Sequence, residues 1–260
     1  MTTISAQDVF ALRARTGVSI LACKSALEEA NGDQEKAIEI LRKRGVAQAV
    51  KKADRVQSEG AIFIAENGTK AAIIVLKCET DFVARNPDFV TMGDTFAKTA
   101  LAKGVDAAKK EIDAGLPDAI QKLGENITAE EIQEILAPSL SAYVHSNRKI
   151  AVVIGADPAG TDAMKLKDVA MHAAALNPLY VRPEEVTAES IEKEREIWKE
   201  QMKKDAAKPQ AILDKIVQGK EKKFREENSL LTQAFVKDPS MTVEKYLGSA
   251  KVTSYVRVTV

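Results

Sequence analysis

The chain has 260 residues, of which 45% are hydrophobic and 29% are charged, so its composition is that of an ordinary globular protein. Its 38 basic residues balance 38 acidic ones, which excludes the overall positive field that drives sequence-independent nucleic-acid binding. No apolar run approaches the ~20 residues that a membrane span needs, and the first residues lack the pattern of a secretion signal. We therefore expect a cytoplasmic protein with no direct nucleic-acid partner and no membrane partner.

Residues 1–55 are expected to form a small module of three helices. Ser5 and Asp33 stand where the first and third helices would begin, since their side chains can accept hydrogen bonds from the first free N–H groups. Gly45 would end the third helix. The stretch 42–55, which holds six basic residues and one acidic residue, would follow as a solvated linker helix.

The second helix of this module has one apolar face. At about 100° per residue, Leu21 projects almost opposite to that face and should be exposed, although single leucines on a surface are common and need no function. The face expected to be buried consists of Ile20, Cys23, Ala26, Leu27 and Ala30. Cys23 and Cys78, the only cysteines, stand far apart within apolar patterns, which favours two buried thiols over a disulfide or a metal site.

After the linker the apolar pattern changes from helical to extended. Residues 61–65 and 71–76 predict a β-hairpin with a well-buried second strand, followed by a helix that Asn86-Pro87 would open. A weaker copy of this unit lies between 143 and 176, which favours two related α+β subdomains.

Three further segments complete the expected fold. Residues 105–124 should be helical, with breaks at Gly115 and Pro117. Residues 188–226 are polar with a thin apolar line, which predicts two amphipathic helices in an antiparallel hairpin that projects or pairs with another copy. Residues 252–260 alternate between apolar and polar, as in a strand that returns to the second subdomain's sheet.

Nothing in the sequence calls for covalent chemistry. Neither GxxxxGK[ST] nor GxGxxG is present, so neither common nucleotide cradle is expected. The two histidines, His145 and His172, lie in different units and outside the spacings of metal sites or thiol nucleophiles. His172 is expected to be a packed or partly exposed helix residue. We therefore predict no catalytic residue, no metal and no cofactor.

Asp81-Phe82 stands out because it follows a buried strand and precedes a capped helix, where loops present side chains to partners. An aromatic residue beside a carboxylate on a rigid edge could anchor an interface. From the residues alone, however, we expect Phe82 to pack inward, because aromatic side chains at strand ends usually do so.

Thr80-Asp81-Phe82-Val83 resembles the signature of the elongation factor Ts family. Three other landmarks stand in that family's order: Leu12-Arg13-Ala14-Arg15-Thr16-Gly17 with Cys23-Lys24-Ser25-Ala26-Leu27; Lys122-Leu123-Gly124-Glu125-Asn126-Ile127; and Met171-His172-Ala173-Ala174 leading to Pro178. The resemblance covers the chain from about residue 4 to the last strand. It implies an α+β fold with these parts: a three-helix, ubiquitin-associated-like module with a basic linker at 1–55, core subdomain N at 56–140, core subdomain C at 141–182 and 228–260, and a protruding antiparallel helical hairpin at 183–227.

The resemblance also implies a partner, elongation factor Tu, a GTPase that needs help to release GDP and Mg²⁺. By that likeness, Asp81 and Phe82 would enter the partner near its Mg²⁺ site, with Phe82 displacing partner side chains and Thr80 and Val83 setting their loop. Further contacts would come from Arg13, Ile20, Leu21, Lys24, Leu123, Gly124 and His145, and more weakly from the Phe235-Val236 region. The hairpin mediates dimerisation in some members, so a homodimer is possible here too.

The sequence departs from the family pattern in three places. Ile20 and Leu21 replace two methionines often found there, which keeps bulk and apolarity. The chain stops at Val260, without the C-terminal extension of some members. Residues 128–131 match a helix-opening capping box, whereas the family has an extended segment there, and we favour the extended structure.

Two other functions stay open at this point. A non-enzymatic adaptor would use the ubiquitin-associated-like module to bind ubiquitin-like or ribosomal partners, with the core as a spacer. A hydrolase or transferase would use His145 or Cys78. An exchange factor would carry out no covalent step of its own.

Overall fold

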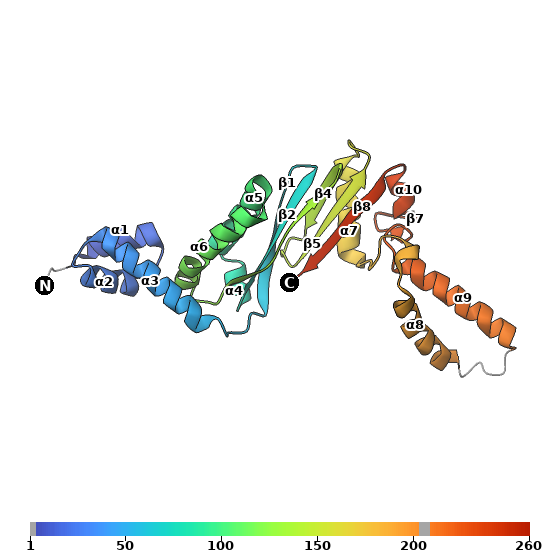
Figure 1. Cartoon of the computed structure of the whole chain (residues 1–260), viewed down its shortest axis with the longest axis horizontal. Helices are drawn as coiled ribbons and strands as arrows, with labels where there is room; N and C mark the ends of the chain where they lie inside the picture. Colours follow the sequence, from blue (N-terminus) through green and yellow to red (C-terminus); the bar gives the residue numbers. More distant parts are fainter. Residues whose placement is uncertain (1–3, 203–208) are drawn as a thin grey trace.

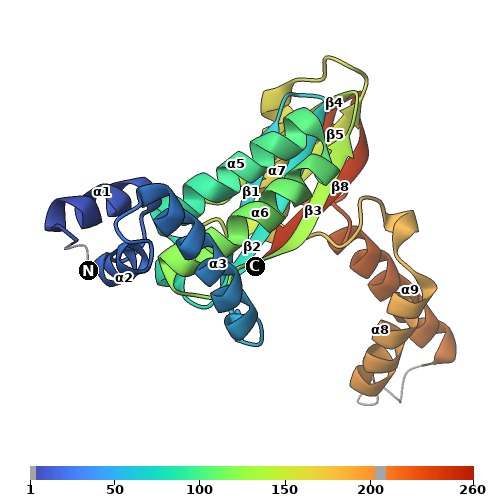
Figure 2. The same ribbon diagram turned by 60° about the vertical axis from the view of Figure 1, so that its left-hand side comes forward.

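The computed structural model describes residues 4–202 and 209–260, and its mixture of helices and sheets confirms the expected α+β class. The molecule is elongated: three N-terminal helices lie at one end, two sheets with their covering helices in the middle, and the helices α8 and α9 at the other end (Figure 1, Figure 2). Within the described ranges, no helix is both long and apolar enough to cross a membrane.

The N-terminal helices are capped as the sequence predicts. They are α1 (Ala6–Thr16), α2 (Ile20–Glu29) and α3 (Gln34–Lys52). The Ser5 hydroxyl accepts the Asp8 N–H at 3.1 Å, and the Asp33 carboxylate accepts the Glu35 N–H at 3.0 Å. Their shared core includes Leu12, Leu27 and Cys23, which is a free buried thiol, as expected.

Two antiparallel sheets stack face to face in the middle of the molecule. Their strand orders are β1-β2-β3 and β4-β5-β8, and an apolar layer that includes Ile62, Ile73, Leu140 and Val153 fills the space between them. The strands are β1 (Glu59–Glu66), β2 (Lys70–Cys78), β3 (Thr128–Leu136), β4 (Ser139–Val144), β5 (Ile150–Asp157) and β8 (Lys251–Thr259). The predicted hairpins, the extended segment at 128–131 and the returning last strand are thus all present.

Helices cover the outer faces of both sheets. Helices α5 (Pro87–Lys103) and α6 (Val105–Leu123) lie on the first sheet, and α7 (Ala163–Leu176) lies on the second (Figure 2). The predicted cap of α5 is confirmed, because the Asn86 side chain accepts the Asp88 N–H at 2.9 Å and proline follows at the first position. The layer order is therefore helix, sheet, sheet, helix, which covers both faces of each sheet and buries the central strands β2 and β5.

The helix end predicted at Gly45 and the two helix breaks predicted at Gly115 and Pro117 are wrong. Helix α3 runs through Gly45, and α6 runs through Gly115 and Pro117. A Cβ at Gly45 would lie 3.1 Å from the Pro117 carbonyl oxygen, so this glycine serves close packing of α3 on α6 and does not end a helix. Buried Ile112 and Ile120 hold α6 to the core on both sides of the proline, and this packing outweighs the hydrogen bond that proline removes.

The remaining elements follow α7 in the chain. They are η1 (Pro183–Glu185), α8 (Ala188–Gln201), α9 (Gln210–Glu227), β6 (Ala234–Phe235), β7 (Asp238–Thr242) and α10 (Val243–Leu247). Helices α8 and α9 contact each other through the rings of Trp198 and Phe224, whose centroids lie 6.1 Å apart. The short turn expected between them falls at 203–208, outside the described residues. The Phe235 ring is buried and stacks on Tyr246 at 4.2 Å.

Candidate functional site

The segment after β2 forms a single helical turn, α4 (Asp81–Ala84), where the sequence predicted a loop. The Thr80 hydroxyl caps this turn by accepting the Val83 N–H at 3.4 Å. A threonine cap followed by aspartate in the first turn favours a helical start, which explains the difference. Val83 and Ala84 are buried against the first sheet's core, so the turn has a fixed orientation.

Phe82 projects from this turn into solvent, with 83% of its surface exposed. The expectation that it packs inward is wrong, because Val83 and Ala84 occupy the inward side of the turn and the core beneath already holds Phe63 and Phe89. Asp81 is half-buried, and its carboxylate pairs with Arg85 at 3.1 Å. The structure thus presents an aromatic ring on a rigid support, beside a carboxylate.

The sequence-predicted contact residues of the N-terminal module lie on its surface. Leu21 is 77% exposed, as predicted, and Arg13 and Lys24 are exposed as well. Ile20 was expected on the buried face but is 45% exposed, because as the first residue of α2 it lies beyond the core of the module. These four residues belong to α1 and α2, which Figure 1 shows on a different part of the molecule from α4.

Three other predicted residues lie at the ends of elements. Leu123 is half-buried and packs on the first core. Gly124 follows α6 with a φ of +83°, a left-handed conformation that glycine adopts without strain. His145 is exposed in the turn between β4 and β5, where its Nδ1 lies 2.8 Å from the Tyr143 hydroxyl.

A cleft of about 620 Å³ separates α4 from the turn that follows His145. Arg148 makes part of its wall and joins the two sheets: the guanidinium binds the Asp94 carboxylate at 3.0 and 3.3 Å and lies 5.0 Å from the centre of the Phe63 ring. Lys149 adds an ion pair with Glu59. These contacts hold the turn of the second sheet in a fixed position relative to Phe82.

Two buried titratable groups, one in each core, hold segments that carry candidate contact residues. The Cys78 thiol donates to the Thr80 carbonyl oxygen at 3.2 Å, and burial, with help from the Glu125 charge, raises the pKa of this thiol to about 11. His172 is fully buried, as a packed helix residue, and its Nδ1 accepts the Val236 N–H at 3.1 Å. Burial lowers the pKa of His172, so the ring is neutral and fixes the segment that carries the exposed Val236.

Glu125 was not among the predicted site residues, yet its carboxylate accepts the N–H groups of Glu79 and Thr80 at 3.0 Å each. The signal was present in the Lys122 to Ile127 landmark, but the partners of Glu125 are more than forty residues away in the chain, at separations of 46 and 45. Local spacing could not reveal them.

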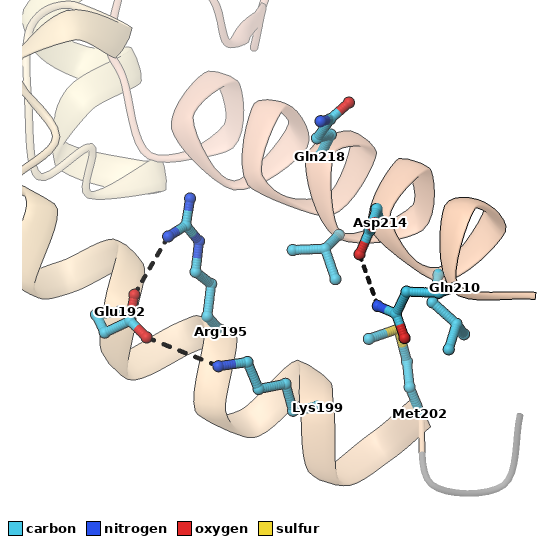
Figure 3. Close-up of a pocket in the computed structure, with 9 residues that line it drawn as sticks. Glu192, Arg195, Lys199, Met202, Gln210, Asp214 and Gln218 are labelled. Carbon is cyan, nitrogen blue, oxygen red and sulfur yellow. Dashed lines mark hydrogen bonds and ion pairs between the residues drawn. The ribbon is translucent and has the colours of Figure 1, made fainter. Parts of the chain in front are cut away.

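The groove between α8 and α9, about 640 Å³ in volume, lies far from α4 (Figure 1). Figure 3 shows that its charged groups mostly pair within their own helix: Glu192 contacts both Arg195 and Lys199, and Gln210 donates to Asp214 at 2.8 Å. Across the part of the chain that the structure describes, no cluster of three or more His, Cys, Asp or Glu residues is arranged to hold a metal ion.

Exposed apolar side chains on rigid turns, held by buried neighbours, are typical of proteins that act by binding another macromolecule. A family model described as Elongation factor TS matches residues 79–260. Elongation factors Ts from Deinococcus deserti and Deinococcus radiodurans are each 42% identical to this chain, over 96% of it and 97% of their own length. The elongation factor Ts of Nitratiruptor sp. is 42% identical over 98% of this chain and 92% of its own. The chain belongs to the elongation factor Ts family, and its role is that of a translation elongation factor.

Proposed function

We propose that this chain is a guanine-nucleotide exchange factor that binds elongation factor Tu·GDP, dislodges Mg²⁺ and promotes GDP release so that GTP can bind. The observation that carries the proposal is that Phe82 is 83% exposed on a capped helical turn whose next two residues, Val83 and Ala84, are buried. Asp81 and Phe82 enter the partner near its Mg²⁺ site, while Thr80 and Val83 hold the turn in place. No covalent chemistry occurs on this chain.

Exchange follows from differential affinity. A factor that binds the empty or loosened partner more tightly than the GDP-loaded partner must weaken GDP binding by the same factor, because binding free energies are linked. Mg²⁺ is a large local positive charge that neutralises the diphosphate. Its displacement by an intruding ring and carboxylate therefore speeds GDP release, and abundant GTP takes the empty site.

Further contacts come from outside the Phe82 turn. The residues that would grip the partner's nucleotide domain are Arg13, Ile20, Leu21 and Lys24, with Leu123, Gly124 and His145 as contacts of the core. We assign 1–55 as a ubiquitin-associated-like module, 56–140 and 141–182 with 228–260 as the two core subdomains, and 183–227 as a hairpin through which two copies can pair.

The test is the release of fluorescent GDP from elongation factor Tu, followed by stopped flow. The intact chain at catalytic amounts should accelerate release, and Phe82→Ala should abolish most of that acceleration. Met164→Ala is the matched control, because Met164 is 69% exposed at the start of α7 and has no assigned contact. Absence of acceleration by the intact chain at micromolar concentration refutes the exchange function. Partner binding with unchanged GDP release favours the adaptor instead.

A further inference from the structure

Two carboxylates form a reciprocal clasp beneath the Phe82 turn. Glu125, just after α6, accepts the N–H groups of Glu79 and Thr80 through Oε2 at 3.0 Å each, and accepts the Thr80 hydroxyl through Oε1 at 2.5 Å. In return, Oε1 of Glu79 accepts the Asn126 N–H at 2.7 Å. Each carboxylate therefore holds the backbone of the segment that carries the other.

The hydroxyl of Thr80 connects this pair of carboxylates to the turn that carries Phe82. The Thr80 hydroxyl donates to Glu125 and at the same time accepts the Val83 N–H, so it links the carboxylate to the residue after the ring. Hydrogen bonds to an ionised acceptor are shorter and stronger than neutral ones. Phe82 itself is 83% exposed, so packing does little to orient its ring. Its direction is set by the backbone on both sides, and Glu125 fixes that backbone.

Residues 124–126, the loop after α6 that contains Glu125, are also bound to the end of α3. The buried Asn126 side chain donates to the carbonyl oxygens of Ala53 at 3.1 Å and Arg55 at 3.3 Å. The Lys52 ammonium donates to the Gly124 carbonyl oxygen at 2.6 Å. The loop that holds the Phe82 turn is therefore itself held by the last residues of α3 and the chain just beyond it.

We infer that Glu125 is a positioning residue for nucleotide exchange: it fixes the backbone of Glu79 and Thr80 and so aims Phe82 at the partner. This inference rests on the proposed function. Glu125 acts through Phe82, so its removal matters for exchange only while the ring is present. A residue that merely stabilised the fold would affect exchange with or without the ring.

A double-mutant cycle in the GDP-release assay separates these two roles, using the full chain with Glu125→Ala and Phe82→Ala singly and together. Glu125→Ala should lower the maximal exchange rate about tenfold, which corresponds to ~1.4 kcal/mol, with a smaller change in the concentration of factor needed for half that rate. In the Phe82→Ala background the same substitution should change the rate by less than about twofold, as expected for coupled residues. Glu125→Gln should restore most of the activity, because the amide oxygen can still accept both N–H groups.

Hydrogen exchange supplies a second measurement that does not depend on the partner. The amides of Glu79 and Thr80 should exchange faster in Glu125→Ala, or in Glu125→Asp if the alanine variant does not fold, because the shorter carboxylate cannot reach both N–H groups. In Glu125→Gln they should keep most of their protection. An equal loss of rate in both backgrounds, or a full rate in Glu125→Ala, overturns the positioning role and leaves the exchange function intact. A Phe82→Ala variant as active as the parent instead overturns the proposed role of the ring, and the positioning role with it.

Discussion

Gly93 lies on the face of α5 that covers the first sheet, and replacement by alanine tests how tightly that face is packed. A Cβ there would lie 2.3 to 2.4 Å from three atoms of the Phe63 ring. The ring is fully buried, with the Phe89 ring 6.0 Å away and the Arg148 guanidinium 5.0 Å from its centre. It has little room to step aside, so the helix or the ring must shift.

Two opposing effects decide the size of the change. Overpacking a well-filled core costs about 1–3 kcal/mol, and overlap with three ring atoms places Gly93→Ala in the upper part of that range. Replacing glycine by alanine inside a helix also stabilises the helix by roughly 1 kcal/mol, because alanine has the higher helix propensity. We expect a net loss of about 1–2 kcal/mol, which lowers the melting temperature by roughly 2–8 °C for a protein of this size.

Scanning calorimetry of Gly93→Ala measures this, with Gly115→Ala as the matched control. Gly115 also lies inside a helix, but its Cβ would meet only Phe96 at 3.5 Å, an ordinary contact, so the control should melt at or above the temperature of the parent. A Gly93→Ala protein that melts no lower than the parent would refute the reasoning, since the ring would then have space that the structure does not give it.

Two more predictions concern stability at the ends of helices and in the second core. Burial lowers the pKa of His172 from its usual 6.5, so the unfolded chain binds the proton more readily: stability is complete above about pH 6.5 and falls below it, by at most ~1.4 kcal/mol per pH unit. Urea unfolding at pH 5 to 7 should reveal this loss, and His172→Gln should lack it; a parallel loss in that variant would exclude the histidine. At Gly124 an added Cβ would meet no atom within 4 Å, but the φ of +83° is strained for alanine. Gly124→Ala should therefore lower the free energy of unfolding by about 1–2 kcal/mol, which urea unfolding measures as a lower midpoint. An unchanged midpoint would contradict this.

The elements that were predicted correctly are those with local causes. Ser5, Asp33 and Asn86 cap helices through N–H groups two or three residues away, and strand alternation is likewise visible in a short window. Gly45 and Pro117 were misjudged because local rules treat them as breaks, whereas each is part of a helix that another helix holds in place.

The site residues also fall into those that local sequence could predict and those that it could not. Leu21 could be placed on the surface from helix periodicity, but the inward packing expected for Phe82 followed a general tendency of aromatic residues, and the helical turn set by Thr80 reversed it. Glu125 could not be found, because its partners come from another part of the chain. Helix caps can be predicted from a short stretch of sequence, whereas hydrogen bonds between distant segments can be identified only from the folded structure.

The unbroken course of α3 through Gly45 affects how strongly a partner would be held. A helix of 19 residues is about 28 Å long and stiff, so the surface around Leu21 and the ring of Phe82 keep a fixed separation. If both engage one partner, the first contact delivers the second at high effective concentration, and little entropy is lost in bringing them together. A flexible joint in place of α3 would leave every individual contact intact and still weaken the complex, because the effective concentration of the second contact would fall.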